Sequence, residues 1–286
     1  MVRKLWYVIL DKSTHLWGWI TGKYYFEDFV RVYPGGVVFN RYGKPQPPSQ
    51  NDTNNFLNHQ KFYRFAAQFA RDATVADVAC GSGHGSEILK MAGAASIHGT
   101  DISKSAIAFA QKNYGNLAQF TVQGITHLTR FADNSFDLTI SSEVLEHIKE
   151  YGKERQAVSE LNRITRPGGI VIIGTPNSEL LGGHGFYYDE LKAILSGFFH
   201  RYCIFENALV PFGNNRLDWE KRLANHGTGI IVSQKIDLSE TVLFPEHAMP
   251  ELKRGIEPGT YNLGNLEINT TLLHNTHSWM VVAIKD

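Results

Sequence analysis

Apolar residues recur in two alternating patterns between about residues 56 and 208. Helical spacing predicts a helix over 56–71, and short apolar runs that alternate with further helical patterns predict strands. The predicted strands are 75–79, 95–99, 119–122, 136–140 and 169–174, and the other predicted helices are 86–91, 103–114 and 153–165. Repeated units of a short apolar strand and a helix are typical of a parallel sheet that is covered on both faces.

The segments on either side of this alternation differ from it in composition and in hydrophobic pattern. Residues 1–55 contain Trp6, Trp17 and Trp19 and end in the proline-rich segment 44–49, which we expect to be irregular. We predict that 1–55 form a strand-rich cap, with a substrate lid or a dimer surface as alternatives. Residues 209–277 are rich in Asn, Gly, Pro and His and are predicted to be an insertion before a closing strand at 278–284. The main domain is therefore expected over 56–286.

Composition and charge exclude several classes of protein. The chain has 28 Lys and Arg against 28 Asp and Glu, and this zero net charge argues against a nucleic-acid partner. Two cysteines exclude a disulfide scaffold and favour a reducing compartment. The apolar run 5–10 is too short for a signal peptide, and no run approaches the ~20 residues of a membrane span. We expect a soluble, cytoplasmic protein with no membrane partner.

A glycine-rich segment, Asp77-Val78-Ala79-Cys80-Gly81-Ser82-Gly83-His84-Gly85, follows the first predicted strand of the main domain. Glycines let the backbone turn tightly and approach a ligand, although such a segment can also be a plain turn. Its G-x-G-x-G spacing differs from the G-x-G-x-x-G pattern of dinucleotide-binding proteins. Asp101 ends the second strand, where a carboxylate can accept hydrogen bonds from both hydroxyls of a ribose. Its alternative role is a helix N-cap or a surface charge. Ile102 beside it offers an apolar face to a purine ring.

Together with later segments, these residues resemble the class I S-adenosylmethionine (SAM) methyltransferases. The motifs stand in the order of that family at 75–83, 99–103, 134–141, 142–148 and 161–169, and 174–177 close the fifth strand. The resemblance covers about 56–207. It implies an α/β, Rossmann-like fold with a seven-stranded, mostly parallel sheet, an antiparallel last strand and flanking helices. It also implies SAM as the cofactor.

The resemblance implies a set of cofactor-binding residues. They are Tyr63, Ala79, Cys80, Gly81, Gly83, Asp101, Ile102, Gly124, Ile125 and Ser142. Ala79, Cys80, Gly81 and Gly83 would line the methionine end of SAM, and Ser142 would lie near the sulfonium. Asp101 would hold the ribose, and Ile102 would pack on the adenine. The family often has an acidic residue where this chain has Ile125, which can offer the adenine amine only its backbone.

Methylation of an alcohol requires a base, and a histidine has a suitable pKa. His147, just past the fourth strand, and His184, in the loop after 177–183, are the two candidates, with structural roles as the alternative. Glu143, Glu146 and His147 form E-x-x-E-H, which resembles a segment that is thought to hold a divalent cation in some ubiquinone-pathway O-methyltransferases. The same segment is common in relatives without a metal. A divalent cation is therefore an alternative that we do not favour, and no metal site is assigned.

The resemblance favours a small-molecule acceptor. The segment Gly174-Thr175-Pro176-Asn177, the loop that carries His184 and the predicted helix 189–195 are most similar to methyltransferases of sugar and glycan pathways. We therefore expect a saccharide or glycoconjugate hydroxyl, within carbohydrate biosynthesis. A quinone or polyketide O-methyltransferase and an amino-sugar N-methyltransferase are the alternatives. An NAD-dependent oxidoreductase and a non-catalytic SAM-binding scaffold protein are the rivals from other classes. Homo-oligomerisation stays open at this point.

Overall fold

The computed structural model describes residues 32–39, 45–178, 184–208, 230–234, 260–263, 266–269 and 276–286. The chain divides into two compact units, Met1–Asn58 and His59–Asp286. Trp6, Trp17 and Trp19 lie outside the described residues, as does most of 209–277. The roles predicted for the cap and the insertion therefore stay predictions. Among the described residues, no helix has both the length and the apolar character needed to cross a membrane.

The first unit is described from residue 32 onward and contains short elements. A 3-10 helix, η1 (Pro34–Gly36), precedes β1 (Val38–Phe39), which pairs antiparallel with β2 (Pro45–Gln46). We expected 44–49 to be irregular, but a strand of only two residues needs few ladder hydrogen bonds and so tolerates Pro45. The helix α3 (Gln50–Ala66) begins before residue 56, where we expected it to start. It begins there because the Ser49 amide donates to Asp52 Oδ2 at 2.8 Å and the Asp52 amide donates to Ser49 Oγ at 3.2 Å.

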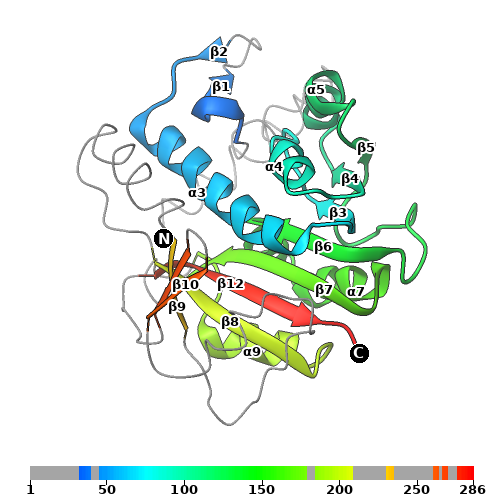
Figure 1. Cartoon of the computed structure of the whole chain (residues 1–286), viewed down its shortest axis with the longest axis vertical. Coiled ribbons are helices and arrows are strands. Elements are labelled where there is room, and N and C mark those ends of the chain that lie inside the picture. Colours follow the sequence, from blue (N-terminus) through cyan, green and yellow to red (C-terminus); the bar gives the residue numbers. More distant parts are fainter. Residues whose placement is uncertain are drawn as a thin grey trace. The chain divides into compact units, whose positions relative to one another are not determined.

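The second unit is built on a mostly parallel sheet (Figure 1). Its seven core strands are β3 (Thr74–Val78), β4 (Ser96–Asp101), β5 (Gln119–Val122), β6 (Phe136–Ser142), β7 (Thr165–Pro176), β8 (Arg201–Ala208) and β12 (Thr276–Ile284). They lie in the order β5-β4-β3-β6-β7-β12-β8, and β12 is antiparallel to both β7 and β8. This arrangement confirms the predicted seven-stranded sheet with an antiparallel last strand.

Three short strands extend the sheet beyond β8. They are β9 (Ile230–Gln234), β11 (Leu266–Asn269) and β10 (Thr260–Leu263), and β9 pairs with β8. All three come from 209–277, which we predicted only as an insertion. The weak hydrophobic periodicity of 209–277 did not indicate these strands.

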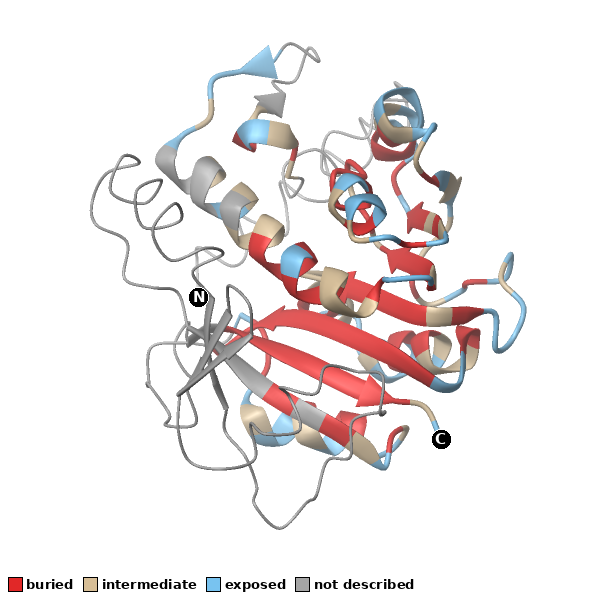
Figure 2. Ribbon diagram, viewed as in Figure 1, coloured by how far each residue is buried: buried red, intermediate tan, exposed pale blue. Residues whose placement is uncertain are grey.

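Helices cover both faces of the core sheet. Besides the part of α3 from His59 onward, they are α4 (Gly85–Met91), α5 (Lys104–Tyr114), α6 (Leu145–Lys149), α7 (Glu154–Ile164) and α9 (Tyr188–Leu195), and a 3-10 turn, η2 (Ala67–Phe69), follows α3. Along β7, Ile170 and Ile172 join one apolar cluster, whereas Val171 and Ile173 join another. Successive side chains of a strand point to opposite faces, so the two clusters are the two covered faces of the sheet. Figure 2 shows that its central strands are buried.

Candidate active site

The loop that follows β3 turns through three residues with positive φ. These are Ala79 at 62°, Gly81 at 55° and Gly83 at 77°. The Cys80 amide donates to the Thr100 carbonyl at 2.8 Å, which anchors the loop to the end of β4. A Cβ atom placed on Gly81 would meet no atom within 4 Å, so the backbone there faces open space. A ligand can therefore approach the main chain closely at this point.

Asp101 connects this loop to the start of α5. Its Oδ2 accepts the Gly81 amide at 2.9 Å, and its Oδ1 accepts the Ser103 amide at 2.9 Å. Ser103 is the N-cap of α5, as predicted, because its side chain accepts the Ala106 amide. The Asp101 carboxylate therefore ties the glycine-rich loop to the start of α5.

An exposed apolar side chain lies next to Asp101. Ile102 is 68% exposed although it is large and apolar. Its Cδ1 lies 3.7 Å from the place of a Cβ on Gly124, so the two residues are neighbours. Ile125, in contrast, is buried in an apolar cluster, which leaves only its backbone for a ligand. Ser142, which we expected just after the fourth strand, is the last residue of β6.

A buried polar cluster supports the glycine-rich loop. The Tyr63 hydroxyl lies 3.1 Å from each carboxylate oxygen of Asp77, and both residues are buried. Burial raises the pKa of Asp77 to about 7, the bond from Tyr63 opposes this shift, and the charge of Asp101 adds to it. A Cβ on Gly85 would collide with the Tyr63 ring, so this position requires glycine. The Tyr63 hydroxyl binds Asp77, and direct contact of Tyr63 with SAM stays a prediction.

Two acidic residues follow β6. Glu143 has a φ of 54°, and its amide donates to the Gly174 carbonyl of β7 at 2.8 Å. Glu146, in α6, is 3% exposed, and its Oε2 accepts the Thr175 hydroxyl at 3.0 Å. Burial raises the pKa of Glu143, and the charge of Glu146 raises it further. Burial also raises the pKa of Glu146 to about 7, against the opposing effect of its hydrogen bonds.

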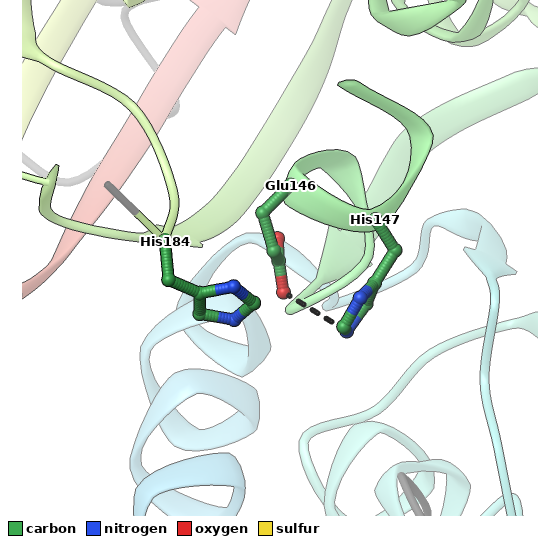
Figure 3. A group of neighbouring side chains, drawn as sticks. All are labelled: Glu146, His147 and His184. Atoms are coloured by element: carbon green, nitrogen blue, oxygen red, sulfur yellow. Dashed lines mark ion pairs between the residues drawn. The ribbon is translucent and has the colours of Figure 1, made fainter. Parts of the chain in front are cut away.

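The structure brings the two predicted catalytic histidines together beside Glu146 (Figure 3). His147 Nε2 lies 3.6 Å from Glu146 Oε1, and the rings of His147 and His184 have centroids 5.6 Å apart. Burial, followed by the proximity of His184, lowers the pKa of His147 below its ordinary value of 6.5. The imidazole of His147 is therefore neutral near pH 7 and able to accept a proton.

The same three side chains form a ligand set for a metal ion. One ligand atom from each of Glu146, His147 and His184 lies within 4.8 Å of the other two. Two imidazoles and a carboxylate suit divalent transition metals. This set differs from the E-x-x-E-H set of the sequence, because His184 takes the place of Glu143. No metal was favoured from the sequence alone, where nothing placed His184 next to His147.

Sequence reasoning gave no role to three residues that the structure places at the site. Thr175 binds Glu146, Asp77 binds Tyr63, and Lys149 contacts the backbone next to His184. Asp77 stands in the glycine-rich motif, so its position was visible but its burial was not. Nothing in the local sequence indicates the contacts of Thr175 or Lys149, because their partners lie far away along the chain.

Comparisons with known proteins identify the domain that carries this site. The profile of the methyltransferase domain family matches residues 76–173. A Mycolicibacterium smegmatis protein named as a probable S-adenosylmethionine-dependent methyltransferase is 28% identical over 43% of this chain and 45% of its own length. The mitochondrial ubiquinone biosynthesis O-methyltransferase of Dictyostelium discoideum is 30% identical over 37% of this chain and 36% of its own length.

A solved structure supports the fold. The complex of the Haloferax volcanii Trm112 methyltransferase activator with a methyltransferase matches with a TM-score of 0.51 at 14% identity, covering 82% of this chain and 94% of that chain. The matched segment spans less than half the length of each of the two curated relatives. The matched residues 76–173 contain the glycine-rich loop, Asp101 and the segment from Ser142 to His147. Residues 76–173 therefore form a methyltransferase domain of the class I SAM-dependent family, whose methyl donor is SAM.

Proposed function

We propose that the protein transfers the methyl group of SAM to an oxygen atom of a small-molecule acceptor. The observation that carries this proposal is the position of Glu146, His147 and His184 at the edge of the sheet where the glycine-rich loop lies. β3 leads into the glycine-rich loop, and β6 leads into the segment that carries Glu146 and His147. The two strands are adjacent and parallel. Both segments therefore leave the sheet at its carboxyl edge, where α/β proteins bind their ligands.

The residues near the glycine-rich loop position the cofactor. The methyl group of SAM is already activated, so the protein mainly has to align it with the acceptor and exclude water. In this proposal Asp101 accepts the ribose hydroxyls in addition to its two backbone donors. Ile102 and Gly124 cover the adenine, and the open backbone at Gly81 admits the methionine end.

The residues after β6 and β7 handle the proton of the acceptor. An acceptor hydroxyl must lose its proton as the methyl group arrives, and a positioned base typically contributes about 10²–10⁴ in rate. His147 fits this role because its lowered pKa keeps it neutral. Glu146 lies beside it and in its ionised form stabilises the imidazolium that forms, whereas His184 flanks the same space from the segment after β7.

The acceptor class is the less constrained part of the proposal. The ubiquinone-pathway relative is an O-methyltransferase by name, which supports an oxygen acceptor. A saccharide or glycoconjugate hydroxyl is proposed from the sequence resemblance around 174–195 alone. A quinol hydroxyl, a polyketide hydroxyl and an amino-sugar nitrogen are the alternatives that an acceptor panel distinguishes.

One observation favours a second function of the cluster, which is to bind a divalent cation. The three ligand atoms of Glu146, His147 and His184 lie close enough to hold a divalent cation. Such an ion lowers the pKa of a bound hydroxyl, which would replace the base. The neutral imidazole of His147 has a single basic nitrogen lone pair, so it cannot both bind the ion and accept the proton. The two accounts therefore predict opposite effects of a chelator.

The proposal is tested in two steps. Calorimetric titration with SAM and S-adenosylhomocysteine, with NAD as the control, is expected to show binding of the two adenosyl ligands alone. Transfer of a labelled methyl group is then measured with a methyl glycoside, a catechol, a fatty acid and glucosamine, with and without EDTA. Turnover of a hydroxyl acceptor that resists EDTA supports His147 as the base, and turnover that EDTA abolishes supports the cation. Binding without any turnover supports the scaffold protein, and binding of NAD alone supports the oxidoreductase.

A further inference from the structure

The segment that carries His184 is attached to α6 by a lysine. Lys149 is the last residue of α6, the helix that also carries Glu146 and His147. Its Nζ donates to the Gly185 carbonyl at 3.0 Å and to Glu190 Oε2 at 2.6 Å. The same ammonium lies 4.7 Å from the centroid of the Phe186 ring. One side chain therefore contacts the two residues that directly follow His184.

The backbone just beyond His184 is held firmly from the sheet. Phe186 is fully buried, its amide donates to the Pro176 carbonyl at 3.0 Å, and its carbonyl accepts Trp279 Nε1 at 2.8 Å. Gly185 has a φ of 111°, and a Cβ there would collide with the Pro176 carbonyl. These contacts bind the segment to β7 and β12. The contacts of Lys149 attach the same segment directly to α6, the helix of Glu146 and His147.

We propose that Lys149 is a positioning residue that holds His184 beside Glu146 and His147. This inference rests on the proposed function of that cluster. His184 is exposed and comes from a different segment, so packing alone does not fix its place. A lysine suits the role because its ammonium has three donors and also interacts favourably with an aromatic face. A misplacement of about 1 Å in a reacting group can cost about 10²-fold in rate, so a side chain remote from the reacting atoms can control turnover.

The test compares Lys149→Met with Lys149→Arg and with the matched control Lys153→Met. The control removes one exposed positive charge close by, and Lys153 has only backbone hydrogen bonds among those that the structure describes for it. The first readout is the nuclear Overhauser effect between the ring protons of His147 and His184 in histidine-labelled protein. His147→Gln and His184→Gln assign the two signals. The second readout is the split between kcat and the Kd for SAM, with the acceptor that the panel identifies.

The expected result is specific to the positioning role. Lys149→Met loses the ring-to-ring signal and lowers kcat by about 10- to 100-fold, whereas the Kd for SAM stays within about twofold. Lys149→Arg restores most of the ring-to-ring signal and of kcat, because its guanidinium has five donors. Lys153→Met behaves as the wild type. A signal that persists in Lys149→Met, or an unchanged kcat, overturns the inference. If Lys149→Met fails to fold by circular dichroism, Lys149→Gln takes its place with the same expectations.

The two proposals fail in different ways. If the wild type turns over no acceptor, the proposed function fails, but the signal between His147 and His184 still tests the positioning by Lys149. If the wild type is active and Lys149→Met keeps both the signal and the rate, only the inference about Lys149 fails.

Discussion

Replacement of Asp77 by asparagine tests the polar cluster that supports the glycine-rich loop. The Asp77 side chain is 1% exposed and is hydrogen-bonded to Tyr63. Its pKa is raised from 3.8 to about 7 by burial, and the nearby charge of Asp101 contributes to this, whereas the bond from Tyr63 opposes it. An asparagine keeps an acceptor for the Tyr63 hydroxyl but cannot ionise. The substitution therefore separates the charge of Asp77 from its hydrogen bond.

The sign of the effect follows from proton linkage. A folded-state pKa above the unfolded value means that the folded protein holds the proton more tightly. The stabilisation is complete below the unfolded pKa of 3.8 and is lost as the pH rises through the folded pKa of about 7. The folded and unfolded pKa values of Asp77 differ by about 3 pH units, and one pH unit corresponds to ~1.36 kcal/mol. The stabilisation that is lost is therefore about 4 kcal/mol. The Asp77→Asn protein does not have this loss. Its free energy of unfolding should therefore rise by about 4 kcal/mol relative to that of the wild type as the pH increases from 4 to 8.

Urea unfolding followed by circular dichroism measures this difference at each pH. Asp137→Asn is the control with the opposite sign. Burial opposes ionisation of Asp137, but hydrogen bonds from Thr74 and Arg166 leave its pKa below the ordinary value. Its stabilisation is present above the unfolded pKa and is lost only as the pH falls through the folded pKa. A difference between Asp77→Asn and the wild type that stays constant within about 1 kcal/mol from pH 4 to pH 8 would refute the raised pKa of Asp77.

Three further substitutions test the site. His147→Gln should lower kcat by about 10²–10⁴ and remove an acidic limb of the kcat profile, whose midpoint lies below that of an ordinary histidine; a limb that survives would point to another base. Gly85→Ala should destabilise the protein by about 1–3 kcal/mol in urea unfolding, because its Cβ would strike the Tyr63 ring, and an unchanged midpoint would contradict that contact. Ile102→Ser should weaken SAM about tenfold in calorimetry through lost apolar burial of about 1.5 kcal/mol, whereas an unaltered Kd would place the adenine elsewhere.

The local features of this protein can be predicted from its sequence. The periodicity of apolar residues indicated the helices and strands between 74 and 195 except the short helix α6, because a helix or strand that packs on a core must present apolar residues at its own repeat. The glycine-rich loop and the cap at Ser103 were visible because they depend on residues a few positions apart. The ordered motifs between 75 and 177 were sufficient to indicate the family.

The tertiary structure decided which side chains meet. It placed His184 against His147 and Glu146, and it set Lys149 against the backbone next to His184. It also buried Asp77 deeply enough to raise its pKa. None of these contacts follows from spacing along the chain, since each joins segments that approach only when the strands pair and the helices pack over them. Secondary structure reflects local repeats, whereas the electrostatics of a site depend on burial and on neighbours that only the closed fold supplies.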